Sequence, residues 1–129
     1  MIEQTQDFLN KARESLQGAE SELVNRRYNN AANRAYYACF HAAIAALLVA
    51  GIRDERWEHD FVQSRFSGIL IRQRKLYPSE LGRYLPDNFD IRREGDYKPA
   101  SVSSKRAREA VDRAREFVRS IARQVEGQK

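Results

Sequence analysis

Apolar residues recur at helical spacing along almost the whole chain. In the first segment they fall within an arc of roughly 100° on a helical wheel, and the charged side chains around them fall outside that arc. This pattern predicts an amphipathic helix of about twenty residues, with a turn after it at residues 26–29. The apolar positions are Phe8, Ala12, Leu16, Ala19 and Leu23.

The second segment is apolar on every side of the wheel. It covers residues 30–50 and is followed by Gly51 and by a charged stretch at residues 52–56. A helix that is apolar all round is normally buried, so we expect this one to be the central helix of the fold. Gly51 suits a C-terminal cap, and the charged stretch suits a turn.

The middle of the chain is less regular. A third helix is predicted over residues 57–76, ended by Pro78, and a short helical turn over residues 79–85, closed by Pro86. Residues 86–101 contain prolines, a glycine and many charges, so they are expected to form a long connection. Connections of this length are often functional.

A last helix is predicted over residues 102–125. Ser101 or a neighbouring serine is its expected N-cap. No strand pattern or internal repeat interrupts the sequence. The predicted fold class is therefore all-α, an antiparallel four-helix bundle with an extra short helix, in a single domain over residues 1–129.

The cysteine content and the hydropathy of the sequence indicate in which cellular compartment the protein is expected. Cys39 is the single cysteine, which excludes an internal disulfide and suits a reducing cytoplasm. The first residues carry no basic segment leading into an apolar run, so no signal peptide is expected. The longest apolar stretch, residues 42–52, is too short to span a bilayer. We therefore expect a cytoplasmic protein that has no membrane partner.

The net charge of +5 is unevenly placed. Basic and acidic side chains balance over residues 1–52, so the whole excess lies in residues 53–129. A basic tract favours an anionic partner such as RNA or a nucleotide phosphate, although it can equally be a solvated face. The candidate anion-binding residues are Arg65, Arg72, Arg74 and Lys75.

Two polar groups stand out in the central stretch NRAYYACFHAA, residues 33–43. Arg34 and His41 are seven residues apart, so they share one helical face about 10 Å apart along the axis. Small residues lie on or beside the same stripe and would suit a crevice or a symmetric helix contact. They are Ala31, Ala38, Ala42 and Ala45.

Such a pair suits RNA chemistry. An imidazole titrates near neutral pH and can take a proton from a 2′-hydroxyl or return one to a leaving oxygen. A guanidinium can grip a phosphate and oppose transition-state charge. Neither role needs a metal or another cofactor, and two histidines with one cysteine, at no recognised ligand spacing, predict no metal site. Alternatively, both groups pair with carboxylates inside the bundle and have no chemical role.

The same residues resemble the signature of HEPN-domain proteins, small helical domains often encoded beside minimal nucleotidyltransferases. The first family motif is matched by Arg34, Tyr36, Tyr37, Phe40 and His41. A second motif is similar to Arg92, Asp96 and Tyr97 in the stretch IRREGDYKP. The resemblance extends from about residue 5 to residue 125 and includes the closing helix.

This resemblance implies a helical bundle that is usually dimeric and, in many members, a metal-independent ribonuclease acting as the toxin of a toxin–antitoxin pair. His41 would be the general acid or base, Arg34 the phosphate clamp, and Tyr37 a substrate-orienting or base-stacking residue. The antitoxin would be a minimal nucleotidyltransferase. Alternatively, the chain is a non-catalytic module that binds such a partner or a nucleotide, or a plain dimerisation protein.

Other residues have competing interpretations. Arg92, Asp96 and Tyr97 orient the substrate, or else pin a loop, with Asp96 bonded to Arg92 or Arg34 and Tyr97 packed under the second helix. His59 is expected at the surface. The aromatic side chains and the cysteine of this region are expected in the core and not at a ligand site: Tyr28, Tyr36, Cys39, Phe40 and Trp57.

Overall fold

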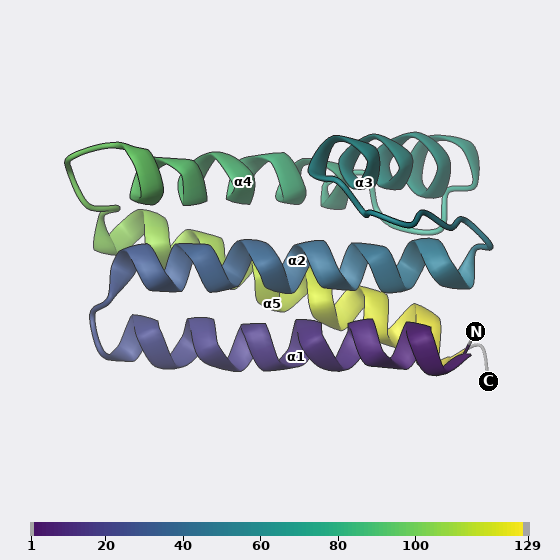
Figure 1. The fold of residues 1–129 in the computed structure, drawn as a ribbon, viewed down its shortest axis with the longest axis horizontal. Helices are drawn as coiled ribbons and strands as arrows, with labels where there is room; N and C mark the ends of the chain where they lie inside the picture. Colours follow the sequence, from purple (N-terminus) through teal and green to yellow (C-terminus); the bar gives the residue numbers. More distant parts are fainter. Residues whose placement is uncertain (1, 128–129) are drawn as a thin grey trace.

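The computed structural model describes residues 2–127, and within this range the chain is helical without any strand. Figure 1 shows α1, α2 and α4 running alongside one another, with α5 behind them. This confirms the predicted all-α bundle. The elements are α1 (Ile2–Val24), α2 (Tyr28–Val49), α3 (His59–Arg65), the π-helix η1 (Phe66–Gln73), α4 (Leu81–Tyr97) and α5 (Ser104–Glu126).

Helix α2 is the centre of the fold, as its all-round apolar pattern predicted. It packs against α1, α4 and α5, and most of its side chains are buried. The alanines of the stripe beside Arg34 are fully buried by helices of the same chain. The interpretation of this stripe as a contact with a second molecule is therefore wrong. Its small side chains instead let the helices within the monomer approach closely.

Gly51 ends α2 as expected. Its φ of +86° is the left-handed conformation that glycine adopts without steric cost. The Gly51 N–H donates to the Leu48 carbonyl and the Ile52 N–H donates to the Leu47 carbonyl, at 3.0 and 2.9 Å. These two bonds form a Schellman motif, which satisfies carbonyls that the helix end would otherwise leave open.

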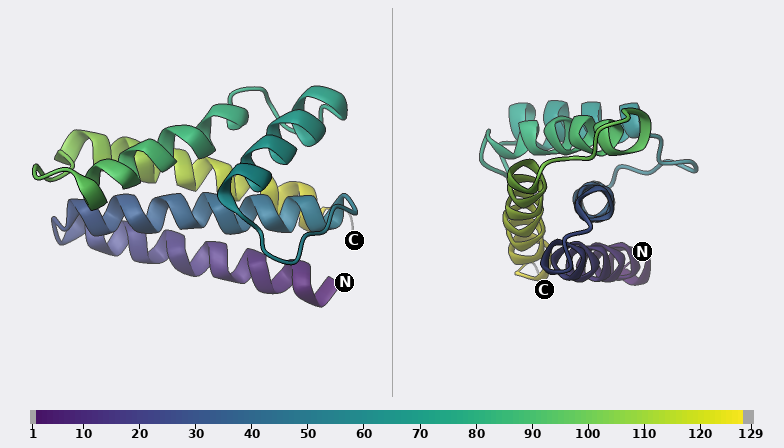
Figure 2. Two further views of the ribbon diagram at one scale, coloured as in Figure 1. Left: turned by 45° about the horizontal axis from the view of Figure 1, so that its top comes forward. Right: turned by 90° about the vertical axis from the view of Figure 1, so that its left-hand side faces the viewer.

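The third predicted helix is present but differs in its bounds and in its winding. It begins at His59, two residues later than predicted, and changes at Phe66 from an α-helix to a π-helix that ends at Gln73. Figure 2 shows α3 and η1 as one rod set at an angle to the other helices. The wide turns of η1 bring Phe66, Leu70 and Ile71 into the core.

The prediction that residues 86–101 form a loop is wrong. Helix α4 continues through Pro86 to Tyr97. A proline inside a helix leaves the carbonyl four residues earlier without its N–H partner, here that of Gly82. The Ser67 hydroxyl on η1 donates to this carbonyl at 3.3 Å. A partner distant in sequence thus replaces the lost bond, and no local pattern shows it.

Replacing Ser67 by alanine is therefore expected to lower the free energy of unfolding by about 1 kcal/mol, because the Gly82 carbonyl loses its side-chain donor. Ser64→Ala is the matched control, since the Ser64 hydroxyl bonds to a carbonyl of its own exposed turn. It should cost less than about 0.5 kcal/mol. Urea unfolding of both variants measures the difference. Equal losses would mean that Ser67 does not support the proline turn.

Asn88 holds the middle of α4 against the core. It is fully buried, and its side-chain amide donates to the Ala110 carbonyl at 3.0 Å and lies 3.6 Å from the Cys39 sulfur. Burial raises the pKa of Cys39 to about 12. Cys39 is therefore a small core residue, as predicted, because a thiol with this pKa holds its proton at neutral pH.

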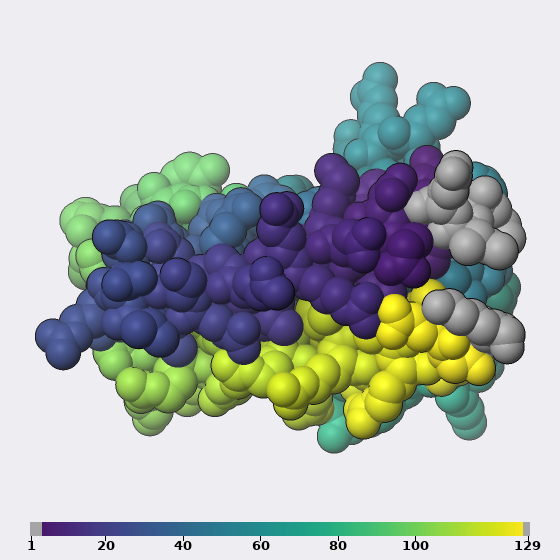
Figure 3. All heavy atoms as spheres, turned by 90° about the horizontal axis from the view of Figure 1, so that it is seen from below, coloured from purple at the N-terminus to yellow at the C-terminus, as the bar shows by residue number. Residues whose placement is uncertain are grey.

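Helix α5 closes the bundle. Ser103, a neighbour of Ser101, is its N-cap, with the hydroxyl accepting from the Arg106 N–H at 3.1 Å. Figure 3 shows α1 and α5 side by side across one face. Ion pairs Arg13–Glu126 and Arg115–Glu20 join them, both at 2.9 Å. None of the described helices is long and apolar enough to cross a membrane.

Candidate functional site

Tyr37 lies between two guanidinium groups on the partly exposed side of α2. The Arg34 carbon Cζ is 5.4 Å from the centre of the Tyr37 ring, and the Arg92 carbon Cζ is 5.7 Å from it. Arg34 is one turn away on the same helix, whereas Arg92 comes from α4. Cation–π attraction of this kind orders both the ring and the cations. The fold thus joins the two sequence motifs at one residue.

Arg34 is exposed and keeps an uncompensated charge. Its stem lies against Gly18 of α1, where an added Cβ would be 3.6 Å from the Arg34 Cδ. Its Nε and Nη2 donate to the Asn33 side-chain oxygen at 3.1 and 2.8 Å. Of the carboxylates that the structure places, none is paired with Arg34. A neutral acceptor orients the guanidinium and leaves its charge free for an anion.

His41 is half-buried, and three aromatic rings surround its imidazole. Its ring centre is 5.9 Å from Phe8, 6.0 Å from Tyr37 and 5.8 Å from Phe40. Its Nδ1 is buried and has no hydrogen-bond partner among the described residues. Burial, together with the charges of Lys11 and Arg34, lowers the pKa of His41 to about 4.

This pKa differs from the sequence-based expectation of titration near neutral pH. At pH 7 the imidazole is neutral and so can accept a proton, but a pKa this far below 7 makes it a weaker base than an unperturbed histidine. Desolvation of the cationic form is the main cause, and two neighbouring cations act in the same direction. The sequence gives no sign of this, because the burial comes from the packing of α1 against α2.

The lowered pKa predicts a loss of stability in acid. Between pH 6.5 and about 4 the unfolded chain binds a proton at His41 that the folded chain excludes, so stability falls as the pH decreases through this range. Because the ring is only half-buried, solvent screening limits the expected loss to about 1 kcal/mol. Urea unfolding at several pH values measures it. In His41→Gln, which cannot titrate, this part of the pH dependence should vanish; its persistence would contradict the assignment.

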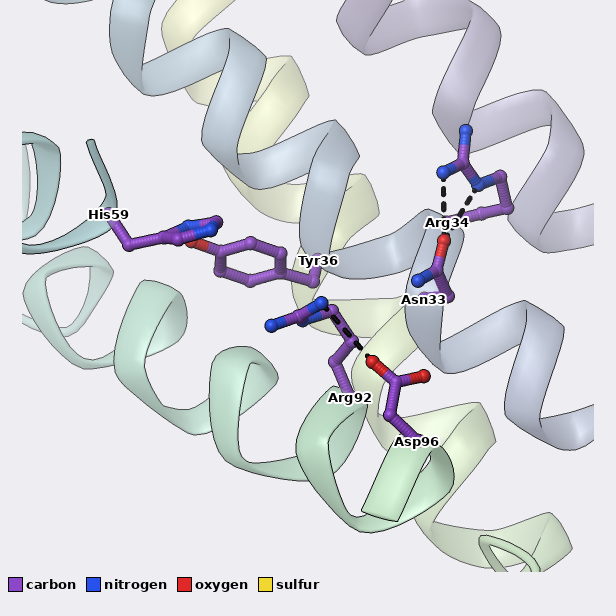
Figure 4. A network of polar contacts seen from close by, with 6 residues as sticks. All are labelled: Asn33, Arg34, Tyr36, His59, Arg92 and Asp96. Atoms are coloured by element: carbon purple, nitrogen blue, oxygen red, sulfur yellow. Dashed lines mark hydrogen bonds and ion pairs between the residues drawn. The ribbon is translucent and has the colours of Figure 1, made fainter. Parts of the chain in front are cut away.

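Arg92 and Asp96 form an ion pair at 3.2 Å along α4, which is one of the two arrangements that we expected for Asp96. Figure 4 shows the Arg92 side chain directed toward the Tyr36 ring and Asp96 bonded to Arg92, with Arg34 oriented by Asn33. Arg92 is 13% exposed, and its Nε is buried without a partner among the described residues. It therefore lies at the site, held by rings and one carboxylate.

Tyr97 does not join the site. It is 74% exposed at the end of α4, with Arg93 beside its ring at 5.9 Å. The interpretation that Tyr97 packs under the second helix is therefore wrong. The helical turn after Arg92 directs residue 97 to solvent, because five residues along a helix point to a different side.

His59 was expected at the surface, and the structure places it there half-exposed, at the edge of an open hollow, but with contacts that the sequence did not predict. Its Nδ1 is 2.5 Å from the Tyr36 hydroxyl, and its ring contacts Phe40 at 4.9 Å and Phe89 at 5.4 Å (Figure 4 shows the pair with Tyr36). Burial and the nearby Arg92 charge lower its pKa. Sequence analysis missed His59 and Phe89 as site residues. His59 lies between Glu58 and Asp60, and Phe89 lies between Asn88 and Asp90, so their neighbours in the chain give no signal of the site.

The basic tract lies elsewhere and is partly used by the fold. Arg65 covers the Phe61 ring at 4.8 Å, and Arg74 donates to the Ala50 carbonyl at 3.0 Å. Arg72 lies beside Gly68, and Lys75 adopts a positive φ after η1. Ala50 is about 24 Å from Arg34 along the α2 axis. Arg74 is therefore far from the Arg34–Tyr37–His41 site, and anion binding by the tract stays a prediction.

The described residues contain no group of three potential metal ligands. The site is built of aromatic rings, the guanidinium groups of Arg34 and Arg92, the Asp96 carboxylate, and two imidazoles beside Tyr37, those of His41 and His59.

The family model of the HEPN domain matches residues 5–125, which includes both motifs at this site. The chain belongs to the HEPN domain family. Among similar proteins, a UPF0332 protein of Thermotoga maritima is 30% identical over 117 residues. The match covers 90% of this chain and 86% of the Thermotoga chain. This HEPN chain is also 29% identical over 120 residues to a Methanocaldococcus jannaschii protein named "Putative toxin MJ0605", covering 92% and 87%. A UPF0332 protein of Gloeobacter violaceus is 32% identical over 101 residues, covering 78% of each.

Proposed function

We propose that this HEPN protein is a metal-independent endoribonuclease and the toxin component of a toxin–antitoxin pair. One observation carries the proposal: Arg34 and a neutral His41 lie on the same side of α2. Arg34 is exposed and has no carboxylate partner among the described residues. The name of the Methanocaldococcus relative is consistent with a toxin role.

In the proposed reaction, His41 accepts the proton of a ribose 2′-hydroxyl. The 2′-oxygen attacks the adjacent phosphorus, the bond to the 5′-oxygen breaks, and a 2′,3′-cyclic phosphate remains. The leaving 5′-oxygen takes a proton from protonated His41 or from water. Arg34 donates to the non-bridging phosphate oxygens and opposes the charge that builds up on them.

The spacing of the pair favours a homodimer. Arg34 and His41 are about 10 Å apart along one helix, so a second copy of each, brought in by a partner subunit, would set more of these groups around one phosphate. A two-fold contact across the Arg34–Tyr37–His41 strip would set each Arg34 near the partner subunit's His41. The buried alanine stripe plays no part in this contact, which would use the half-exposed rings beside it.

The proposed antitoxin is a minimal nucleotidyltransferase, the kind of partner with which HEPN domains are often paired. Its binding would mask the strip that carries Arg34. A ribonuclease toxin acts where cellular RNA is translated, which places the proposed activity in the cytoplasm.

Digestion of a single-stranded RNA in the presence of EDTA tests the ribonuclease proposal. Cleavage is expected to continue in EDTA and to leave 2′,3′-cyclic phosphate ends, because the site uses an imidazole and a guanidinium. An RNA with a 2′-O-methyl group at the cleaved position should resist. Absence of cleavage by folded protein, or cleavage of the methylated RNA, would contradict the mechanism.

A second candidate is a non-catalytic HEPN module that binds a nucleotide or the nucleotidyltransferase. The burial of His41 Nδ1 favours it, because an imidazole with a pKa of about 4 holds few protons for a leaving group at neutral pH. This candidate predicts a stable complex with the co-expressed nucleotidyltransferase and no RNA cleavage by the free protein. The EDTA assay separates the two functions.

A further inference from the structure

A second feature lies directly beside the Arg34–Tyr37–His41 strip. An open hollow of about 480 Å³ lies between α2, the start of α3 and α4. Its aromatic lining comes from five residues that lie far apart in sequence and belong to three parts of the fold: Tyr37, Phe40, Trp57, His59 and Phe89. Tyr37 belongs both to this lining and to the strip.

We propose that this hollow receives one unpaired base of an RNA strand whose phosphate is held at Arg34. The proposal rests on the proposed function, since it takes single-stranded RNA as the substrate and assigns the preference for an unpaired base to a separate set of residues. An unpaired base can leave the strand and stack on aromatic side chains, whereas a base within a duplex cannot.

The rings form a supported platform. The His59 ring centre is 4.9 Å from Phe40, 5.4 Å from Phe89 and 6.3 Å from Tyr37. The hydrogen bond between the Tyr36 hydroxyl and His59 Nδ1 holds the imidazole in position against these rings. Because these contacts hold the rings before any ligand arrives, a base would meet an ordered surface. Stacking of this kind accepts any base, since every base has a π-face.

The charges at the rim favour a base over a phosphate. Glu58 and Asp60 line the hollow together with one cation, Arg56. Two carboxylates repel a phosphate, so the phosphate belongs outside, toward Arg34. The lowered pKa of His59 favours its neutral form, so this imidazole adds no positive charge to the platform.

Trp57 adds an observation of a different kind. Its φ is +50°, a left-handed conformation that is uncommon for a bulky side chain. It lies before α3, against Phe8 and Phe61, with its indole at the hollow and half-buried. Strained backbone persists where the surroundings impose it, and such positions concentrate at ligand sites.

Trp57 also supplies the measurement, because it is the single tryptophan of the chain. Its fluorescence is followed during titration with a 2′-O-methyl oligoribonucleotide, which cannot be cleaved, with AMP and with ribose 5-phosphate. The oligonucleotide and AMP should quench it, the oligonucleotide at concentrations at least about tenfold lower, because a strand offers several phosphates and bases whereas AMP offers one of each. Ribose 5-phosphate, which has no base, should not. Equal quenching by ribose 5-phosphate, or none by any probe, would overturn the proposal.

Matched variants locate the binding. Phe89→Leu should weaken oligonucleotide binding about tenfold, whereas Tyr84→Leu, a half-buried ring on the same helix outside the hollow, should leave it within about twofold. Arg56 is exposed, so Arg56→Ala folds. It should also weaken binding, whereas Arg53→Ala, on the same loop but outside the hollow, should not. Unchanged binding in both Phe89→Leu and Arg56→Ala would place the base elsewhere.

The binding assay and the cleavage assay can fail separately. Base-dependent quenching without RNA cleavage would support the base site and refute the ribonuclease. Cleavage without base-dependent quenching would support the ribonuclease and refute the base site.

Discussion

Replacing His41 by alanine is expected to lower kcat/KM for cleavage of single-stranded RNA by about 10²–10⁴-fold, because the 2′-hydroxyl loses its proton acceptor. The imidazole is half-buried among Phe8, Tyr37 and Phe40, and its Nδ1 bonds to no described group, so the substitution removes no hydrogen bond that the fold depends on. The rate is measured in EDTA, with circular dichroism confirming that the variant remains helical.

Arg34 gives the complementary test at the same site. Arg34→Ala should reduce cleavage by about 10²–10³-fold, since it removes a donor to the transition-state charge. Arg34→Lys should retain part of the rate, because it keeps the charge without the paired N–H groups. Arg27→Ala is the matched control: Arg27 is an exposed arginine close in sequence, paired with Glu22. If folded His41→Ala protein cleaves within about threefold of the parent rate, His41 is not the base.

The second large effect concerns the fold itself. Phe66→Ala is expected to lower the free energy of unfolding by about 3–5 kcal/mol. Phe66 opens the π-helix η1 and is fully buried, with its ring 5.1 Å from Phe117 of α5 and 5.4 Å from Tyr77. The substitution would leave a cavity between η1 and α5. Such a loss is a large fraction of the stability of a domain of this size. Urea unfolding measures it.

Phe61→Ala is the control for this cavity, because Phe61 is a phenylalanine of the same rod that is only half-buried, under Arg65. It should cost about 1 kcal/mol. Comparable losses in the two variants would show that η1 contributes little to the core. The distinction bears on function as well, since the rod formed by α3 and η1 supports His59 next to the hollow.

The helical pattern was sufficient to predict the architecture. The arc of apolar residues in α1 fixes which side of that helix is buried, and the all-round apolar character of α2 places it in the centre. The family motif around Arg34, Tyr37 and His41 is local to one helix, so its residues share a face by periodicity alone. Arg92 could be associated with them only through the resemblance to HEPN proteins, because it comes from another helix.

Two of the errors have the same physical cause. Pro86 and the charges after it predicted a loop. The Ser67 hydroxyl, however, donates to the Gly82 carbonyl in place of the N–H that proline lacks, and α4 continues to Tyr97. His59 has charged neighbours in sequence, but the Tyr36 hydroxyl and the Phe40 ring lie against it in space. In each case the deciding partner is more than ten residues away, and local patterns cannot reveal it.

The sequence by itself determined helices α1, α2 and α5, the buried side of α1, the central place of α2, and the presence of a cation and an imidazole on that central helix. The tertiary structure alone decided the state of these groups: the packing of α1 removes water from His41 and lowers its pKa to about 4, and Asn33 orients Arg34 without neutralising it. It also gathered three distant segments around the hollow. Periodicity acts over a few residues, whereas desolvation and charge depend on every neighbour in space.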